Sequence, residues 1–150
     1  MQSRYHNTLT VNGIAQTNGE MYKTTDEVYD REARSLSLQL RDAYGAEAKI
    51  ESLKRTVSLV GGVVTITDEV SLKDKGEVEI HFLTPKEPIF SGNRAQVAEG
   101  RVLTFDARLA PSVEKVELDP SLVGRWGAPE LFMIRLKASV KDATLVCTVE

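Results

Sequence analysis

Apolar and polar residues alternate with a period of two through most of the chain, and helical periodicity is weak. Four segments show the alternation: "SLSLQL" (35–40), "EVEIHFL" (77–83), "LFMIRLKA" (131–138) and "TLVCTVE" (144–150). Such runs, bounded by Gly, Pro, Asn and Asp, are typical of half-buried strands. The sequence therefore predicts an all-β, antiparallel β-sandwich with less than about a tenth of its residues in helix.

The best-specified local unit is a hairpin in "ESLKRTVSLVGGVVTITDEVSLK" (51–73). Gly61 and Gly62 supply the positive φ values that a two-residue hairpin turn needs. The predicted cross-strand pairs are Val60–Val63, Leu59–Val64, Val57–Ile66 and Leu53–Val70, with Arg55–Asp68 on the apolar face and Lys54–Glu69 on the other. A slip by one residue would lose every pairing, so we expect this register to be firmly fixed.

Three segments are predicted to be irregular. Residues 85–100 contain two prolines and two glycines, and "LDPSLVGRWGAPE" (118–130) forms a second long connection. In "TTDEVYDREARS" (24–35) the charged residues leave only a thin apolar stripe, which favours an extended connection over a helix. No repeat or linker divides the chain, so residues 1–150 are expected to form a single β-sandwich domain.

Composition excludes several classes of protein. The chain has 150 residues, 41% hydrophobic and 27% charged, with a net charge of −3, so nothing attracts it broadly to nucleic acid. One cysteine excludes a disulfide framework, and no run approaches the roughly 18 apolar residues of a membrane helix. The first residues, "MQSRYHNT", lack the apolar core of a secretory signal. We therefore expect either a cytoplasmic protein or a longer one whose upstream part is missing.

Known catalytic patterns are also missing. The sequence contains no G-x-S-x-G, P-loop, G-x-G-x-x-G or H-E-x-x-H. His81 lies inside a predicted strand, either on the solvent face or under a neighbouring loop. Cys147 lies on an apolar strand face, where a thiol behaves as a small hydrophobe. Trp126, in a predicted loop, either closes one end of the core or stacks on a sugar ring.

The order of several short motifs resembles the heparinase II/III-like polysaccharide lyases. "RYHNTLTVNGIAQ" (4–16) is similar to their R-x-H-N-T-x-x-x-(N/D)-G-x-x-Q segment. The stretch 43–72, in which "AY" precedes "RTVSL", is similar to their A-Y and R-T-V-x-L stretch. "IHFLTPKEP" (80–88) is similar to their H-F-x-T-P strand, and "LFMIRLKAS" (131–139) to a strand near their carboxyl end. No single motif is specific, so the order and spacing carry the resemblance.

The resemblance implies a larger enzyme. Members of that family combine an amino-terminal α/α toroid with β-sandwich domains, and cleave uronic-acid polysaccharides such as heparin, heparan sulfate or alginate by β-elimination. Many hold a zinc ion through two histidines and an aspartate. The histidine before Asn-Thr is similar to the last of these ligands, so the resemblance implies that His6 is one zinc ligand. The other ligands, the toroid and the catalytic groups would lie upstream and are absent, so we expect no cofactor and no catalytic residue in this chain.

Three interpretations therefore remain open. The chain is the carboxyl-terminal β-sandwich of a bacterial lyase, periplasmic or secreted as a full-length enzyme and inactive alone. Alternatively, it is a stand-alone carbohydrate-binding module that uses a sandwich face or the loop of Trp126, or its role is purely structural. An in-frame upstream toroid would separate the first interpretation from the second. In the first, the partners are the toroid and, through the full enzyme, the polysaccharide, with neither nucleic acid nor membrane.

Overall fold

The two longest strands, β5 (Val63–Thr84) and β10 (Glu130–Val149), determine the architecture. The computed structural model describes residues 6–150, and within this range ten strands hydrogen-bond into one antiparallel sheet. The other strands are β1 (Leu9–Val11), β2 (Thr25–Asp30), β3 (Ser35–Gln39), β4 (Ile50–Val60), β6 (Ile89–Ser91), β7 (Arg94–Ala98), β8 (Arg101–Phe105) and β9 (Ala110–Glu117). Only 9% of the chain is helical, which confirms the predicted all-β class.

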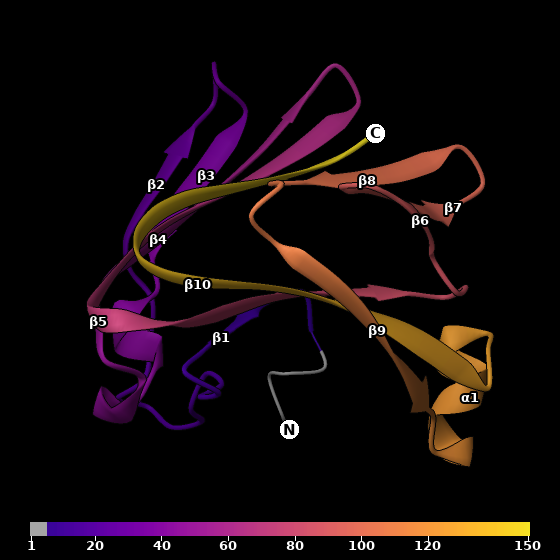
Figure 1. The fold of residues 1–150 in the computed structure, drawn as a ribbon, viewed down its shortest axis with the longest axis horizontal. Helices are drawn as coiled ribbons and strands as arrows, with labels where there is room; N and C mark the ends of the chain where they lie inside the picture. Colours follow the sequence, from indigo (N-terminus) through magenta and orange to yellow (C-terminus); the bar gives the residue numbers. More distant parts are fainter. Residues whose placement is uncertain (1–5) are drawn as a thin grey trace.

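Both long strands bend, so the single sheet folds over itself into two layers (Figure 1). The first layer has the order β2-β3-β4-β5-β10-β8-β7-β6 and contains the amino half of β5 and the carboxyl half of β10. The second layer contains the other halves, flanked by β1 and β9. The pairing of β10 with β5 shifts between Val140 and Asp142, and such irregularities bend a strand. The result is the predicted antiparallel sandwich.

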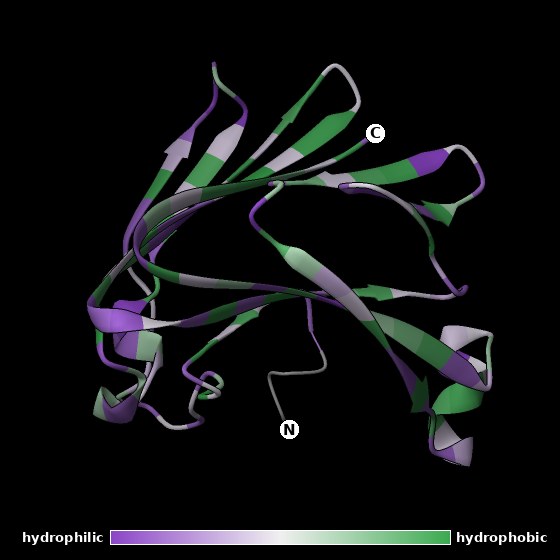
Figure 2. Cartoon of the chain, viewed as in Figure 1, coloured by the Kyte–Doolittle hydropathy of each residue, from purple (hydrophilic) through white to green (hydrophobic). Residues whose placement is uncertain are grey.

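The apolar core lies between the layers. The second layer contributes side chains at alternate positions, namely Leu9, Val11, Val78, Ile80, Phe82, Ile134, Leu136 and Ala138. The first layer contributes Leu53, Val70, Leu72, Ala95, Leu103, Phe105, Leu145 and Cys147. Hydrophobic and hydrophilic positions alternate along the strands in Figure 2, as the period-two pattern predicted.

The β4–β5 hairpin has the predicted register. Every predicted pair is present, including Val57 with Ile66 and Leu53 with Val70. Gly61 and Gly62 have φ values of +60° and +83°, which glycine adopts without strain. Arg55 lies opposite Asp68 on the core face, and the two side chains are buried, with 9% and 0% of their surface exposed.

The prediction of two long loops is wrong in part, because each contains regular secondary structure. Residues 85–100 contain the hairpin of β6 and β7, which are only three and five residues long, too short for their alternation to be evident. Residues 118–130 contain the helix α1 (Pro120–Trp126). The side chain of Asp119 caps this helix by accepting from the Ser121 amide, Pro120 begins it, and Gly127 ends it at a φ of +67°. These end signals were present in the sequence.

The remaining segments are short. The extended connection predicted for residues 24–35 is correct in part, because Thr25–Asp30 pairs with β3 as an edge strand whereas residues 31–34 form a turn. Two 3₁₀ turns, η2 (Arg41–Ala43) and η3 (Ala46–Ala48), precede β4. Among the residues that the structure describes, no helix has the length and apolar character needed to cross a membrane.

Candidate functional site

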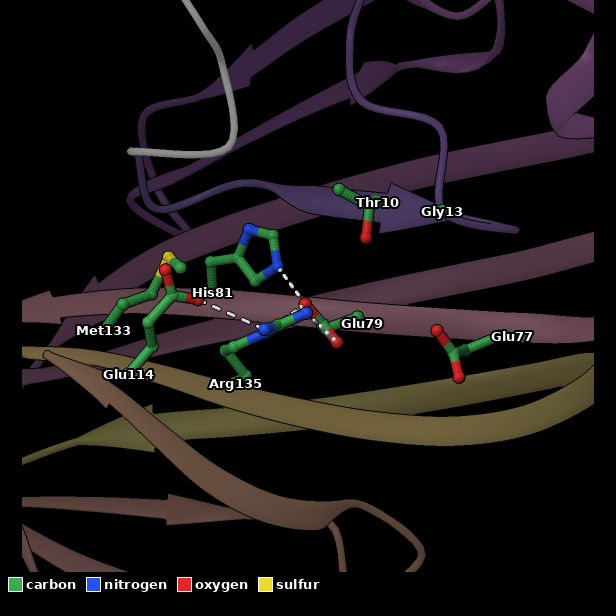
Figure 3. A pocket seen from close by; sticks show the side chains of 8 residues that line it. All are labelled: Thr10, Gly13, Glu77, Glu79, His81, Glu114, Met133 and Arg135. Carbon is green, nitrogen blue, oxygen red and sulfur yellow. Dashed lines mark hydrogen bonds and ion pairs between the residues drawn. The ribbon is translucent and has the colours of Figure 1, made fainter. Parts of the chain in front are cut away.

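The outer face of the second layer contains a cluster of charged side chains beside a small cavity of about 140 Å³ (Figure 3). Strands β1, β5 and β10 present alternate residues to this face, because the intervening positions point into the core, and β9 adds Glu114 beside β10. The cavity is lined by Thr10, Gly13, Glu77, Glu79, His81, Glu114, Met133 and Arg135.

Glu79 is at the centre of this cluster. Its carboxylate accepts hydrogen bonds from Arg135 Nε at 2.7 Å and Arg135 Nη2 at 3.1 Å, which is a bidentate pair. Lys137 Nζ lies 2.9 Å from Glu79 Oε2. Outside this centre, Arg135 Nη1 reaches Glu114 at 3.1 Å and Lys137 reaches Glu77 at 3.2 Å. Both cations are therefore already paired with carboxylates.

Glu79 stays ionised in this environment, although only 2% of its surface is exposed. Burial by itself raises the pKa of the carboxyl group, but hydrogen bonds from Arg135, Lys137 and His81 outweigh it and lower the pKa to about 2. The same contacts raise the pKa values of Arg135 and Lys137. An anionic sugar approaching this cluster would have to compete with Glu79 for both cations.

His81 contacts the same carboxylate. Its Nε2 lies 2.7 Å from Glu79 Oε1, and because an ionised carboxylate only accepts, Nε2 must carry the proton. Nδ1 is buried and has no hydrogen-bond partner among the described residues, and Figure 3 shows it on the side of the ring away from Glu79. The predicted outer-face position is correct, but the side chain is only 2% exposed. The cluster is thus an ion-pair network with two buried members, Glu79 and His81, partly exposed cations and one ring nitrogen without a partner among the described residues.

His6 lies elsewhere, at an exposed position three residues before β1. Its backbone carbonyl accepts from the Thr8 amide at 2.8 Å. Across residues 6–150, no three His, Cys, Asp or Glu side chains gather closely enough to hold a metal ion. The structure therefore places the predicted ligand at the surface without companion ligands from the described part of the chain.

Trp126 and Cys147 occupy contrasting environments. Trp126 is the last residue of α1 and is 53% exposed, so it does not close the end of the core. Cys147 is 1% exposed, and its burial raises the pKa of the thiol to about 12. This agrees with the interpretation of Cys147 as a core hydrophobe.

Sequence reasoning missed the role of Glu79. The signal was available, because "EVEIH" places Glu77, Glu79 and His81 on one face of a strand. "RLK" similarly places Arg135 and Lys137 on one face of another strand. What the sequence lacked was the pairing of these two strands, which are more than fifty residues apart, as the separation of 56 between Glu79 and Arg135 shows.

Comparison with known proteins identifies the fold. No protein-family model matches the sequence, and no curated protein is significantly similar to it. Among solved structures, the heparan sulfate lyase HepC from Pedobacter heparinus matches with a TM-score of 0.70 and 14% identity, covering 99% of this chain. A mutant of that lyase matches with a TM-score of 0.71 and the same identity. The heparinase III BT4657 gene product, with methylated lysines, matches with a TM-score of 0.68 and 17% identity.

These matches cover only part of each lyase. The chain covers 24% of HepC and 23% of the BT4657 heparinase III, while almost its entire length is matched. The chain therefore has the fold of a segment that makes up about a quarter of these heparan sulfate lyases.

Proposed function

We propose that this chain is the β-sandwich part of a heparinase II/III-like polysaccharide lyase and has no lyase activity alone. The observation that supports this most directly is the match of 99% of the chain to about a quarter of each lyase. The order of the sequence motifs points to the same family independently. In the full enzyme the reaction would be β-elimination on a uronic-acid polysaccharide, with the base and the acid supplied by residues outside this chain.

His6 is proposed to contribute one ligand to a zinc site in that enzyme. Tetrahedral zinc needs about four ligands, and the described residues offer no cluster of three. We therefore expect the zinc site to need ligands from another segment. An exposed imidazole just before an edge strand does suit a single ligand in a site completed by another segment, since a neighbouring segment can reach it.

Elimination provides a direct assay, because the unsaturated uronate product absorbs in the ultraviolet. The purified chain is expected to be inactive on heparin, heparan sulfate and alginate, and a longer protein that includes in-frame upstream sequence is expected to be active on at least one. Replacement His6→Ala in the longer protein should remove bound zinc, measured by elemental analysis, whereas Asn18→Ala, at another exposed position, should not. Turnover by the chain alone, lost on mutation of one of its residues, would contradict the proposal.

One observation favours a second candidate, a carbohydrate-binding module. Trp126 is half-exposed at the end of α1 with Arg125 beside it, and an exposed indole can stack on a sugar ring. Since the chain has a single tryptophan, its fluorescence reports on this position alone. Titration with heparan sulfate or alginate oligosaccharides should shift the emission if this function is present. No shift at millimolar oligosaccharide excludes the Trp126 surface as a sugar site.

A further inference from the structure

A buried ion pair in the core contacts the backbone that follows His6. Arg55 donates from Nε and Nη2 to the two carboxylate oxygens of Asp68, at 2.7 and 2.8 Å. Its remaining arm, Nη1, donates to the backbone carbonyl of Asn7 at 3.0 Å, across 48 residues of sequence. The guanidinium therefore joins the β4–β5 hairpin to the amino-terminal segment.

The next two backbone carbonyls of that segment also accept hydrogen bonds from distant parts of the chain. The backbone carbonyl of Thr8 accepts from the His81 amide at 2.8 Å. The carbonyl of Leu9 accepts from the hydroxyl of Tyr44, which is 5% exposed, also at 2.8 Å. Three consecutive carbonyls, from residue 7 to residue 9, are thus bound by three different parts of the chain. In addition, the side-chain oxygen of Asn7 accepts from the Leu83 amide at 2.9 Å.

Hairpin stability alone does not explain a buried ion pair at this position. Desolvation of two charges opposes their burial, and well-packed apolar residues often replace such pairs without loss of stability. The adjoining strand β1, by contrast, is only three residues long and pairs on one side with β5, so the segment before it depends on hydrogen bonds from other parts of the chain. The third donor of Arg55 and the hydroxyl of Tyr44 supply bonds to this segment.

We propose that Arg55, oriented by Asp68, acts with Tyr44 as a set of positioning residues that fix the backbone of residues 7–9 and thereby the direction in which His6 is presented. The functional importance of this positioning rests on the proposed function of His6, but the restraint itself does not. It makes a prediction about the purified chain that involves neither zinc nor substrate.

The test is the double replacement Arg55→Met with Asp68→Leu, which removes both charges and fills the same space with apolar side chains. The fold should persist, with hairpin amides still protected from hydrogen exchange. The amides of His81 and Leu83, which donate to the segment, should exchange at least about tenfold faster, as expected for loss of a hydrogen bond from a charged donor. The NMR signals of the His6 ring should sharpen and move toward those of a free histidine. A role limited to hairpin stability would leave these two readouts unchanged.

Two further variants keep the proposal testable if the double replacement does not fold. Arg55→Lys retains a cation opposite Asp68 but lacks the forked guanidinium, and Tyr44→Phe removes only the hydroxyl. Each should loosen the segment without unfolding the hairpin. Lys54→Met with Glu69→Leu, adjacent on the same strands but on the opposite face, is the matched control and should change neither readout. The proposal would be overturned if the folded Arg55 and Tyr44 variants kept the amide exchange rates and the His6 NMR signals of the unmodified chain. A zinc-free or inactive longer enzyme with a normally restrained segment would instead count against the proposed function.

Discussion

Nε2 of His81 lies 2.7 Å from Oε1 of Glu79, two positions earlier on the same strand. On β10, Arg135 and Lys137 have the same spacing, and the strand pairing sets Arg135 opposite His81 and Lys137 opposite Glu79. Two such pairs on adjacent antiparallel strands bring four ionisable groups to one patch of the outer face. Glu79, which contacts the other three, is expected to dominate its electrostatics.

Glu79 should make the stability of the chain depend on acid pH. Its pKa is lowered from 4.5 to about 2 in the folded state, so the unfolded chain binds the proton first as the pH falls. The stabilisation is therefore complete above about pH 4.5 and is lost as the pH falls through about 2, and it amounts to about 3 kcal/mol. Urea unfolding at a series of pH values measures it.

The matched variant for this experiment is Glu79→Gln, which keeps the shape and removes the charge. Asp106, whose pKa is lowered to about 2 by hydrogen bonds from Arg108, titrates in the same range, so the contribution of Glu79 is the difference between the two pH profiles. The variant should be less stable at neutral pH and show a flatter profile. Parallel profiles would show that the Glu79 network contributes nothing to acid sensitivity.

The turn at Gly61 and Gly62 should tolerate no side chain without a loss of stability. Both have positive φ, and alanine in the left-handed region costs about 1–2 kcal/mol, although a Cβ there would meet no atom within 4 Å. Gly61→Ala should therefore lower the free energy of unfolding by this amount, measured by urea titration. Gly124→Ala, at an equally open position inside α1, should be neutral or stabilising, because alanine favours helix. Equal changes in the free energy of unfolding for the two variants would show that the turn does not require glycine.

Cys147 should be chemically inert in the folded protein. Burial raises the pKa of its thiol to about 12, so almost no thiolate is present at neutral pH. Labelling with a thiol-specific disulfide reagent should be slow in buffer and rapid and complete in 8 M urea, a concentration of the order that unfolds most small domains. Labelling in buffer at the rate of free cysteine would show that the strand ends open readily.

His6→Ala should change the stability of the isolated chain by less than about 1 kcal/mol, because the side chain is exposed. Leu9→Ala, three residues later and fully buried, is the positive control and should cost about 2–5 kcal/mol. Thermal melts with and without added zinc provide the measurement. A large loss of stability that is the same with and without zinc would assign His6 to the core. A zinc-dependent rise in melting temperature that the substitution abolishes would mean that the chain assembles a metal site by itself.

Local pairing was determined by the sequence itself. The β4–β5 register follows from Gly61-Gly62 and from partners close in sequence, such as Val57 and Ile66, so nearby residues were enough to select it. The period-two pattern likewise specified that Val78, Ile80 and Phe82 enter the core, and Ile134 and Leu136 from the later strand, but it did not show that Leu131 and Met133 are buried on the other face. It placed His81 on the outer face correctly, but it did not show that the ring is buried there.

The tertiary structure decided which distant segments meet. Only the pairing of β5 with β10 places Arg135 beside Glu79, and only the closure of the two layers places Arg55 beside Asn7. Alternation fixes the face of a strand on which a residue lies, whereas it carries no information about which strand becomes its neighbour. Glu79 and His81, which the strand pattern assigned to an outer face, therefore became the buried centre of an ion-pair network only in the folded chain, and Arg55, assigned to the core face, became a backbone anchor there.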